Sequence, residues 1–367
     1  MTTTAVQHDP SRTIGAGSYE VRIAAGLRAE FASLIVAAAP AHRYAVITDD
    51  QVGPVYAAAL MSALSAKGRT SLHVVPAGEA YKTRDSWARL TDELLAAGCA
   101  RDTTIVALGG GVVGDLAGFV AATYMRGVPI VQCPTSLLAM VDASVGGKTG
   151  VDTSAGKNLV GAFHAPAIVL ADVEVLATLP IEHRRAGLAE AIKHGVIADA
   201  AHFGELDALL PALLDGNAMA TLDVVARSVE IKASVVAADV RELGVRKTLN
   251  FGHTIGHAVE HASGYALLHG ACVAIGMVLE ARLAEQIGVA ERGTAARIEG
   301  VLTRAGLPVA LPVSMTAETI LAATRLDKKA RAGSVEYALP TRIGAMVNAG
   351  TTWSIAVDDA AVLEALA

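Results

Sequence analysis

The first half of the chain alternates short apolar runs with segments of helical periodicity. Four runs rich in apolar and β-branched residues predict strands at residues 44–48, 72–76, 103–108 and 129–133. Helical spacing of apolar residues marks residues 54–67 and 84–97. Strands that alternate with helices in this way predict a parallel sheet covered by helices on both faces.

The pattern changes after Leu179 and Pro180. Long segments rich in Ala, Leu and Val follow, and they predict helices at 181–197, 219–239, 248–262 and 270–286. A short strand pair is predicted at 336–338 and 346–348. We therefore expect an α/β domain over residues 1–179 and a mostly α-helical domain over residues 180–367. With no repeat and no low-complexity linker between them, the two halves should pack together around a crevice that forms the site.

Composition indicates a globular protein and limits its partners. Of the 367 residues, 53% are hydrophobic and 18% are charged, which excludes extended disorder. The net charge of -6, from 30 Lys and Arg against 36 Asp and Glu, does not favour nucleic acid as a partner. The nearly uncharged stretch 103–125 is not predicted to span a membrane, because Asp115 and several glycines interrupt it.

Two further features favour a cytoplasmic location. The N-terminus, MTTTAVQHDPSRT, has no basic patch followed by an apolar stretch, so no secretory signal is predicted. The three cysteines, Cys99, Cys133 and Cys272, are scattered and form no CxxC motif. We expect them to be reduced core residues rather than disulfides or metal ligands.

The first candidate motif is GGGVVGD at residues 109–115, which follows a predicted strand and precedes an apolar helix. It satisfies the GxGxxG pattern, in which glycines let the backbone approach a pyrophosphate at the start of a helix. No acidic residue ends a strand about 20 residues later, as in an ordinary dinucleotide-binding unit. The motif alone leaves two interpretations open, a structural turn and a variant dinucleotide site.

The second motif is VDASVGGKTGVDTSAGKN at residues 141–158. Lys148 and Lys157 are flanked by glycines and accompanied by Asp142 and Asn158, which suggests a preorganised anion site. The spacing does not fit the GxxxxGK[ST] pattern of a P-loop. The alternative interpretation is a solvated glycine-rich loop.

The third group suggests a metal site. His253 and His257 are spaced i and i+4 on a predicted helix, and His269 begins the next apolar helix. Glu190 and Lys193 share one face of another apolar helix, where burial of both charges is costly without partners. Two imidazoles and one carboxylate would leave open positions on a divalent ion, as in catalytic sites. The spacing does not decide which two of the three histidines bind.

Several longer blocks make the sequence resemble the 3-dehydroquinate synthase family of sugar-phosphate cyclases. In the family's order they are GGGVVGDLAGFVAATYMRGVP, QCPTSLLAMVDASVGGKTG, GKNLVGAF, LAEAIKHG, RELGVRKTLNFGHTIGHAVE and LLHG. They lie between about residue 78 and residue 276, and LDKKARAG at 326–333 resembles the family's C-terminal segment. The resemblance implies a variant dinucleotide-binding α/β domain, a helical metal domain and a catalytic cleft between them.

The resemblance also implies NAD as cofactor and zinc or cobalt as metal. Glu190, His253 and His269 would hold the metal, which assigns His257 to the substrate. The residues implied to bind NAD are Asp49, Gly78, Glu79, Lys82, Gly110, Gly111, Val112, Val113, Gly114, Asp115, Thr135, Ser136, Lys148, Lys157 and Thr178.

A sugar phosphate with a carboxylate at its other end is the implied substrate, and mainly cations would hold it. Arg126 would reach into the site of a neighbouring subunit, so a homodimer is expected. The residues implied to contact the substrate are Asp142, Lys148, Asn158, Lys193, Lys232, Arg246, Asn250, His257 and one of Lys328 and Lys329.

The implied reaction converts 3-deoxy-D-arabino-heptulosonate 7-phosphate to 3-dehydroquinate and phosphate, within the shikimate pathway. The substrate would be oxidised transiently, lose phosphate, be reduced again and close to a carbocycle. Ala271 departs from the family, which usually has Glu after LHG, and this predicts weaker support for His269.

Alternatives remain for the function. An aminodehydroquinate synthase has nearly the same pocket, whereas valiolone-type and inosose-type cyclases alter the residues that contact the carboxylate and phosphate. Asn250 and His257 are kept here, which favours dehydroquinate. A metal-dependent polyol dehydrogenase of the glycerol dehydrogenase type would not need the lysines, and a non-catalytic NAD- or metal-binding protein is a further alternative.

Overall fold

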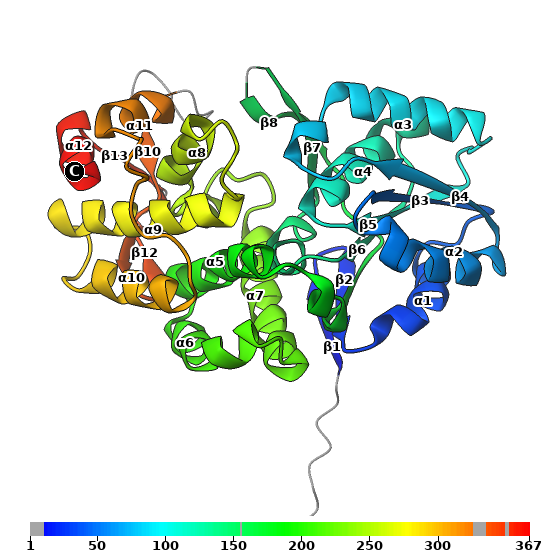
Figure 1. Cartoon of the computed structure of the whole chain (residues 1–367), viewed down its shortest axis with the longest axis horizontal. Helices are drawn as coiled ribbons and strands as arrows, with labels where there is room; N and C mark the ends of the chain where they lie inside the picture. Colours follow the sequence, from blue (N-terminus) through cyan, green and yellow to red (C-terminus); the bar gives the residue numbers. More distant parts are fainter. Residues whose placement is uncertain (1–10, 155, 326–334, 349–351) are drawn as a thin grey trace, which may run out of the picture.

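The computed structural model describes residues 11–154, 156–325, 335–348 and 352–367. In these residues the chain forms two lobes that lie side by side (Figure 1). The strand-rich first half makes the lobe on the right of the view, and the helical second half makes the lobe on the left. The division predicted after residue 179 stays a prediction. The large sheet ends at Asp172, and the long helices begin at Ile181.

A seven-stranded sheet forms the centre of the first lobe, in the order β1-β2-β9-β6-β5-β3-β4. All neighbouring pairs are parallel except β1 and β2, which are antiparallel. The central strands β5, β6 and β9 are buried along their whole length, as expected when both faces are covered. The strands are β1 (Ser11–Ala16), β2 (Tyr19–Ala24), β3 (Arg43–Asp49), β4 (Arg69–Val75), β5 (Thr103–Gly109), β6 (Ile130–Pro134) and β9 (Ile168–Asp172).

Helices cover both faces of this sheet, which confirms the predicted α/β architecture. Val46 and Ile47 of β3 point to opposite faces, and each belongs to a different hydrophobic cluster. Val46 packs in the cluster that contains Leu64 of α2, and Ile47 packs with Val120 of α4. The helices are α1 (Phe31–Ala38), α2 (Ala58–Ser65), α3 (Arg84–Ala96) and α4 (Gly111–Thr123), with short turns η1 (Leu27–Glu30), η2 (Gly53–Ala57), η3 (Glu79–Tyr81), η4 (Tyr124–Arg126), η5 (Ala139–Ala143) and η6 (Val173–Thr178).

The second lobe is built from helices around two apolar clusters, one of which extends to β2 and β9 of the first lobe. Helix α7 contacts both lobes, because it packs on β1 and β2 as well as on α5 and α6. None of the described helices combines the length and the apolar composition that a membrane-spanning helix needs. The helices are α5 (Ile181–Ala198), α6 (Ala200–Leu214), α7 (Ala218–Ala238), η7 (Val245–Asn250), α8 (His253–Ala262), α9 (His269–Gln286), α10 (Thr294–Arg304), α11 (Ala317–Thr324) and α12 (Asp359–Leu366).

Two predicted elements of the second half are wrong in detail. The helix expected at 248–262 begins only at His253, because Gly252 has a φ of 76° and separates it from the 3-10 turn η7. The strand pair expected between 336–338 and 346–348 is instead two pairs. Strand β10 (Glu336–Tyr337) pairs with β13 (Ile355–Ala356), and β11 (Pro340–Arg342) pairs with β12 (Ala345–Met346) across a turn at Gly344.

Part of the glycine-rich segment 141–158 forms a hairpin rather than a loop. Strand β7 (Lys148–Thr153) pairs antiparallel with β8 (Gly156–Phe163), with Lys148 opposite Phe163. The hairpin belongs to the first lobe, where it packs on α4, and it stands next to α8 of the second lobe (Figure 1). The chain therefore places lysines from the first lobe against the helices of the second.

Candidate active site

Three helices of the second lobe meet through direct contacts between their backbones. A Cβ atom added to Gly270 of α9 would lie 2.0 Å from the carbonyl oxygen of Ala186 in α5. A Cβ atom added to Gly276 of α9 would lie 2.0 Å from the carbonyl oxygen of Gly252, just before α8. No side chain larger than hydrogen fits at either position. Helix α9 is therefore held close to both α5 and α8.

This packing gathers Glu190, His253 and His269 at one point. Glu190 lies in the middle of α5, whereas the two histidines are the first residues of α8 and α9. The Nε2 atoms of His253 and His269 each lie 3.5 Å from Oε1 of Glu190. One ligand atom from each of the three residues lies within 4.8 Å of the others. The structure thus brings together three residues that are far apart in the sequence.

The chemistry of these three residues fits a divalent metal ion. Glu190 is completely buried, and neither of its carboxylate oxygens receives a hydrogen bond from the described residues. Two imidazoles and one carboxylate are donors that zinc and cobalt accept, with positions left for other ligands. Two other groups satisfy the same distance limit, namely His257 with Glu260 and His269, and Asp142 with Glu190 and His194. The first set is favoured because both histidines face the same oxygen of Glu190.

Charges around Glu190 determine its protonation. Burial alone would raise the pKa of Glu190, but the ammonium of Lys193, one turn later on α5, holds it well below its usual value. Burial and the same lysine lower the pKa of His253 well below its usual value. Burial would also lower the pKa of His269, yet Glu190 and Glu260 raise it to about 10. Glu190 is thus a carboxylate and His253 a neutral imidazole, the forms that bind metals, whereas His269 must release its proton when it binds an ion.

Glu260 is a residue that the sequence motifs do not single out. It lies on the same face of α8 as His253 and His257, and its side chain is 4% exposed. Its Oε2 lies 3.5 Å from Nδ1 of His269, and its Oε1 lies 2.9 Å from Nζ of Lys157. Glu260 thus places a carboxylate beside His269 from another helix, although position 271 has none, and the expectation of weaker support for His269 stays a prediction.

The glycine motif lies where strand β5 passes into α4, at the carboxyl edge of the sheet. Gly109 and Gly114 are needed for close packing, since Cβ atoms there would lie 2.6 Å from Val113 and 2.8 Å from Gln132. Gly110 is the residue before the helix, and the nearest atom to an added Cβ would be Oγ of Ser136 at 3.4 Å. The helix begins without a side-chain cap, so its first amides face the space beside Gly110 and Gly111.

Asp115 and Lys82 form a buried ion pair beside this helix. Nζ of Lys82 lies 2.6 Å from Oδ2 of Asp115 and 3.8 Å from Oε1 of Glu79. Burial would lower the pKa of Lys82, but Asp115 and Glu79 raise it above its usual value. Lys157 of β8 lies 3.0 Å from the same oxygen of Glu79. These residues from three segments make one charged cluster next to the glycine motif.

The remaining residues predicted for NAD surround the same edge. Asp49 accepts hydrogen bonds from the amides of Gln51 and Val52 at 2.9 and 2.8 Å, so it shapes the turn after β3. The amide of Thr135 donates to Gly109, and the hydroxyl of Thr178 bonds that of Tyr56 at 2.7 Å. Gly78, with a φ of 110°, precedes η3 and Glu79. Val112 and Val113 lie in the first turn of α4.

A second cluster of charges surrounds Asp142 of η5. Nζ of Lys232 lies 2.7 Å from its Oδ1, and Nζ of Lys193 and Nε2 of His194 lie 3.9 and 3.7 Å away. Burial would raise the pKa of Asp142, but Lys232 and Lys193 hold it well below its usual range. Burial lowers the pKa of Lys232, and Asp142 only partly opposes this. Asp142 is thus ionised, and one of its carboxylate oxygens lies within 4.8 Å of a carboxylate oxygen of Glu190.

Arg246 is fixed by backbone contacts. It is 1% exposed, and its Nη1 and Nη2 donate to the carbonyls of Val240 and Gly146 at 2.6 and 3.1 Å. Its Nε has no hydrogen-bond partner among the described residues. Such a buried donor is costly unless a ligand completes it.

Lys148 and Asn250 meet through another residue that the sequence motifs do not single out, Glu242. Lys148 forms an ion pair with Glu242, and Nδ2 of Asn250 donates to the same carboxylate at 2.7 Å. Glu242 stands within the block RELGVR, and its φ of 60° is rare for a side chain of this size. An acidic residue within a block that resembles the family was the sequence signal that could have marked Glu242 as a candidate site residue.

One of the predicted residues, Arg126, lies apart from the glycine motif. Arg126 is exposed in η4, after α4, whereas the glycine motif begins that helix. Thirteen residues of helix separate the two ends by about 20 Å. Asn158, at the start of β8, has a φ of 51°, and its amide donates to Asp152 at 2.8 Å. Lys328 and Lys329 lie outside the described residues.

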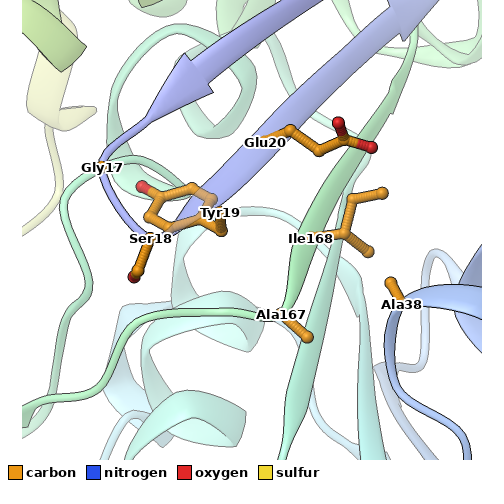
Figure 2. Close-up of a pocket in the computed structure, with 7 residues that line it drawn as sticks. All are labelled: Gly17, Ser18, Tyr19, Glu20, Ala38, Ala167 and Ile168. Atoms are coloured by element: carbon orange, nitrogen blue, oxygen red, sulfur yellow. The ribbon is translucent and has the colours of Figure 1, made fainter.

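A surface hollow at the turn between β1 and β2 lies apart from these groups. Figure 2 shows its lining, with Tyr19 and Glu20 on one side and Ala38, Ala167 and Ile168 on the other. Tyr19 connects this region to the site, because its hydroxyl accepts a hydrogen bond from the amide of Gly146 at 2.9 Å. None of the residues predicted for metal, NAD or substrate lines the hollow.

Comparison with known proteins identifies close relatives. A 3-dehydroquinate synthase of Symbiobacterium thermophilum is 47% identical over 337 residues, which cover 91% of this chain and 94% of the relative. A solved 2-epi-5-epi-valiolone synthase from Streptomyces hygroscopicus subsp. jinggangensis, with NAD+ and Zn2+ bound, is 30% identical. The two structures superpose with a TM-score of 0.85, and the match covers 100% of this chain and 98% of the chain of that synthase.

A solved 2-deoxy-scyllo-inosose synthase, complexed with carbaglucose-6-phosphate, NAD+ and Co2+, is 25% identical. It has a TM-score of 0.88, with 97% of this chain and 99% of that chain covered. The family model described as 3-dehydroquinate synthase N-terminal matches residues 72–186, and the one described as 3-dehydroquinate synthase C-terminal matches residues 187–330. The two models together match more than half of the chain, so the chain belongs to the 3-dehydroquinate synthase family.

Proposed function

We propose that the chain is a lyase that converts 3-deoxy-D-arabino-heptulosonate 7-phosphate to 3-dehydroquinate and inorganic phosphate. The observation that carries this proposal is the meeting of Glu190, His253 and His269 beside cations from both lobes, namely Lys193 from the second and Lys157 from the first. The relative from Symbiobacterium thermophilum, which matches nearly the full chain, supports the same reaction. The shikimate pathway is the corresponding place in metabolism.

NAD and a divalent metal ion are the proposed cofactors, with zinc or cobalt as the metal. The space beside Gly110 and Gly111, at the start of α4, is proposed for the pyrophosphate, and Glu190, His253 and His269 for the metal. The nicotinamide would supply a hydride acceptor that each cycle restores, and the ion a Lewis acid beside the substrate hydroxyls. The two solved cyclases, which contain NAD+ with Zn2+ or Co2+, support this pair of cofactors.

The chain's own residues are proposed to hold and orient a substrate that carries a carboxylate and a phosphate. Lys193 keeps its ammonium in spite of burial, because Glu190 and Asp142 raise its pKa. Asp142 stays ionised between Lys193 and Lys232 and can accept a hydrogen bond from a substrate hydroxyl. Arg246 presents its unpaired Nε, and Lys148 adds a cation from the hairpin. Fixed charges of this kind lower the barrier by orientation and by stabilising developing charge.

The identities of the relatives support the heptulosonate substrate over other sugar phosphates. The relative named 3-dehydroquinate synthase is 47% identical, whereas the valiolone and inosose synthases are 30% and 25% identical. The amino analogue of the same substrate is a competing candidate. Steady-state kinetics with the oxygen and amino substrates side by side would separate these two activities.

A phosphate-release assay tests the proposal directly. The chain is expected to release one phosphate for each substrate consumed in the presence of NAD+ and Zn2+, without net accumulation of NADH. A polyol dehydrogenase would accumulate NADH without phosphate, and a non-catalytic binding protein would produce neither. His269→Ala is the matched variant, and we expect it to lose both turnover and bound metal. Full metal content and turnover in that variant would overturn the metal assignment.

A homodimer in the cytoplasm is the proposed state of the protein. Met125 and Arg126 adopt φ values of 50° and 67°, a costly conformation for two consecutive residues other than glycine. Such strain in an exposed turn supports a functional role for Arg126, and we propose that it completes the site of a second subunit. The three buried, free cysteines fit a reducing compartment.

A further inference from the structure

The environment of His269 differs from that of His253. Nδ1 of His253 lies 3.1 Å from the carbonyl oxygen of Phe251, two residues earlier, so its ring is oriented locally. His269 has Glu260 at 3.5 Å from its Nδ1, at the outer limit of hydrogen bonding. Its Nε2 faces Glu190 at the same distance. The imidazole of His269 thus lies between two carboxylates from two other helices.

Each carboxylate oxygen of Glu260 has a different partner, His269 of the second lobe at Oε2 and Lys157 of the first lobe at Oε1. Its second oxygen, Oε1, accepts a hydrogen bond from Nζ of Lys157 at 2.9 Å. Lys157 also lies 3.0 Å from Glu79 and 5.0 Å from the centre of the Tyr265 ring. Because the lysine neutralises Glu260, the carboxylate can remain buried while its other oxygen points to His269.

We propose that Glu260 is a positioning residue of the metal centre, which fixes the ring of His269 so that Nε2 is directed to the ion. A histidine ligand whose other nitrogen donates to a carboxylate has a fixed tautomer and a fixed ring orientation. In this chain the partner comes from α8 and not from position 271, where Ala271 offers no carboxylate. Lys157 in turn holds Glu260, so a residue of the first lobe supports a ligand of the second.

This inference rests on the proposed metal site and not on the overall reaction. The test therefore measures binding of Zn2+ alone to the full-length protein, without NAD or substrate, by competition with a chromophoric chelator. If the parent protein bound no zinc, the metal site itself would be wrong. If the parent bound zinc and the variants bound it equally well, only the role of Glu260 would be wrong.

Glu260→Gln is expected to weaken zinc binding roughly 10- to 100-fold, as removal of partners of metal-bound histidines does. Glu79→Gln is the matched control, because it removes the same charge from the same lysine without touching His269. We expect Glu79→Gln to change zinc affinity much less. An equal loss in both variants would assign the effect to the charge of the cluster and would overturn the positioning role.

Glu260→Asp provides a second variant that keeps the charge but shortens the side chain by one methylene group. It is expected to weaken zinc binding and to alter the visible spectrum of the cobalt-substituted protein, which reports ligand geometry. Thermal unfolding of the metal-free proteins checks that each variant is folded. Parent-like zinc affinity in a folded Glu260→Gln or Glu260→Asp protein, with a parent-like cobalt spectrum, would refute the proposal.

Discussion

Nζ of Lys232 lies 2.7 Å from Oδ1 of Asp142 and 2.6 Å from the main-chain carbonyl of the same residue, although 90 positions separate the two in the sequence. Lys232 is on α7 and Asp142 is in η5, so the contact joins a helix to the turn after β6. The side chains are 9% and 24% exposed. Their attraction is therefore only weakly screened by solvent.

We expect Asp142→Asn to destabilise the protein by about 2–3 kcal/mol at pH 7, because it leaves the buried ammonium of Lys232 without its carboxylate partner. The folded pKa of Asp142 lies well below its unfolded value of about 3.9. The pair thus contributes its full stability at pH values above the unfolded pKa of Asp142. This contribution is lost as the pH falls from there through the folded pKa. Urea unfolding from pH 7 down to pH 3 should show a flatter acid dependence in the variant.

Asp207→Asn is the control for this measurement. Asp207 pairs with Arg304 on the surface, where both side chains are more than a third exposed, at 34% and 57%. Surface pairs of this kind contribute about 0–1 kcal/mol. If Asp142→Asn proved as mild as Asp207→Asn, the buried pair would have no special role in stability.

Gly276→Ala should disturb the metal centre through the backbone alone. The added methyl group would lie 2.0 Å from the carbonyl oxygen of Gly252 and 2.7 Å from the amide nitrogen of Gly256, so α8 must move. We expect a loss of about 1–3 kcal/mol or more in unfolding free energy and weaker zinc retention. Calorimetry and metal analysis measure both.

Gly204→Ala, on the exposed face of α6, is the matched substitution. Apart from the backbone of α6 itself, no atom of the described residues lies within 4 Å of a Cβ added there, and alanine is favoured in a helix by roughly 0.5–1 kcal/mol. It should leave the metal content unchanged and raise the stability slightly. Equal behaviour of the two variants would show that the contact between α8 and α9 is not tight.

Lys148→Ala should impair catalysis without unfolding the chain. The side chain is 52% exposed and pairs with Glu242 at the edge of the site. Loss of one charge-assisted contact to the substrate, about 1.5–3 kcal/mol, corresponds to roughly a 10- to 100-fold lower kcat/KM. The unfolding midpoint should stay close to that of the parent. A melted variant would instead assign Lys148 a structural role.

Mixing subunits tests the proposed role of Arg126. Arg126→Ala and His269→Ala should each be inactive as pure proteins. In a mixed dimer, one site would combine an intact His269 with Arg126 from the other subunit. Refolding the two variants together should therefore restore about a quarter of the parent activity, because half of the dimers are mixed. No recovery, in dimers shown to be mixed, would mean that Arg126 does not act across the interface.

Sequence patterns predicted the elements whose apolar runs are long and continuous. Strands β3, β5 and β6 are such runs, whereas β4 begins with three polar residues and was predicted only from Leu72. Strand β9 is an exception, because it is apolar and buried but was not predicted. Strand β1 alternates exposed and half-buried residues and contains Arg12, so its pattern is weak. The hairpin β7–β8 contains Gly150 and Gly161 opposite each other, which resemble loop residues in a sequence. Its two strands come close because neither residue has a side chain.

Residue spacing alone predicts the metal ligands as residue types but not as a set, and the full set was implied only by the family resemblance. The spacing of His253 and His257 marks a helix face, yet only the packing of α9 on α5 and α8 shows that His269 and His253 share Glu190. Glu242 and Glu260 pair with Lys148 and Lys157, which lie 94 and 103 positions earlier in the sequence. Their roles depend on tertiary contacts that local spacing does not encode.

Main-chain contacts at Gly270 and Gly276 position the helices that carry the proposed metal ligands, whereas most residues proposed to hold the sugar phosphate are long side chains such as Lys148 and Lys232. Exchanging those side chains leaves the three helix positions untouched. Substitutions of those side chains can therefore change which substrate the enzyme binds, while the metal site is retained. The same scaffold is in this sense predisposed to yield new ring-forming enzymes.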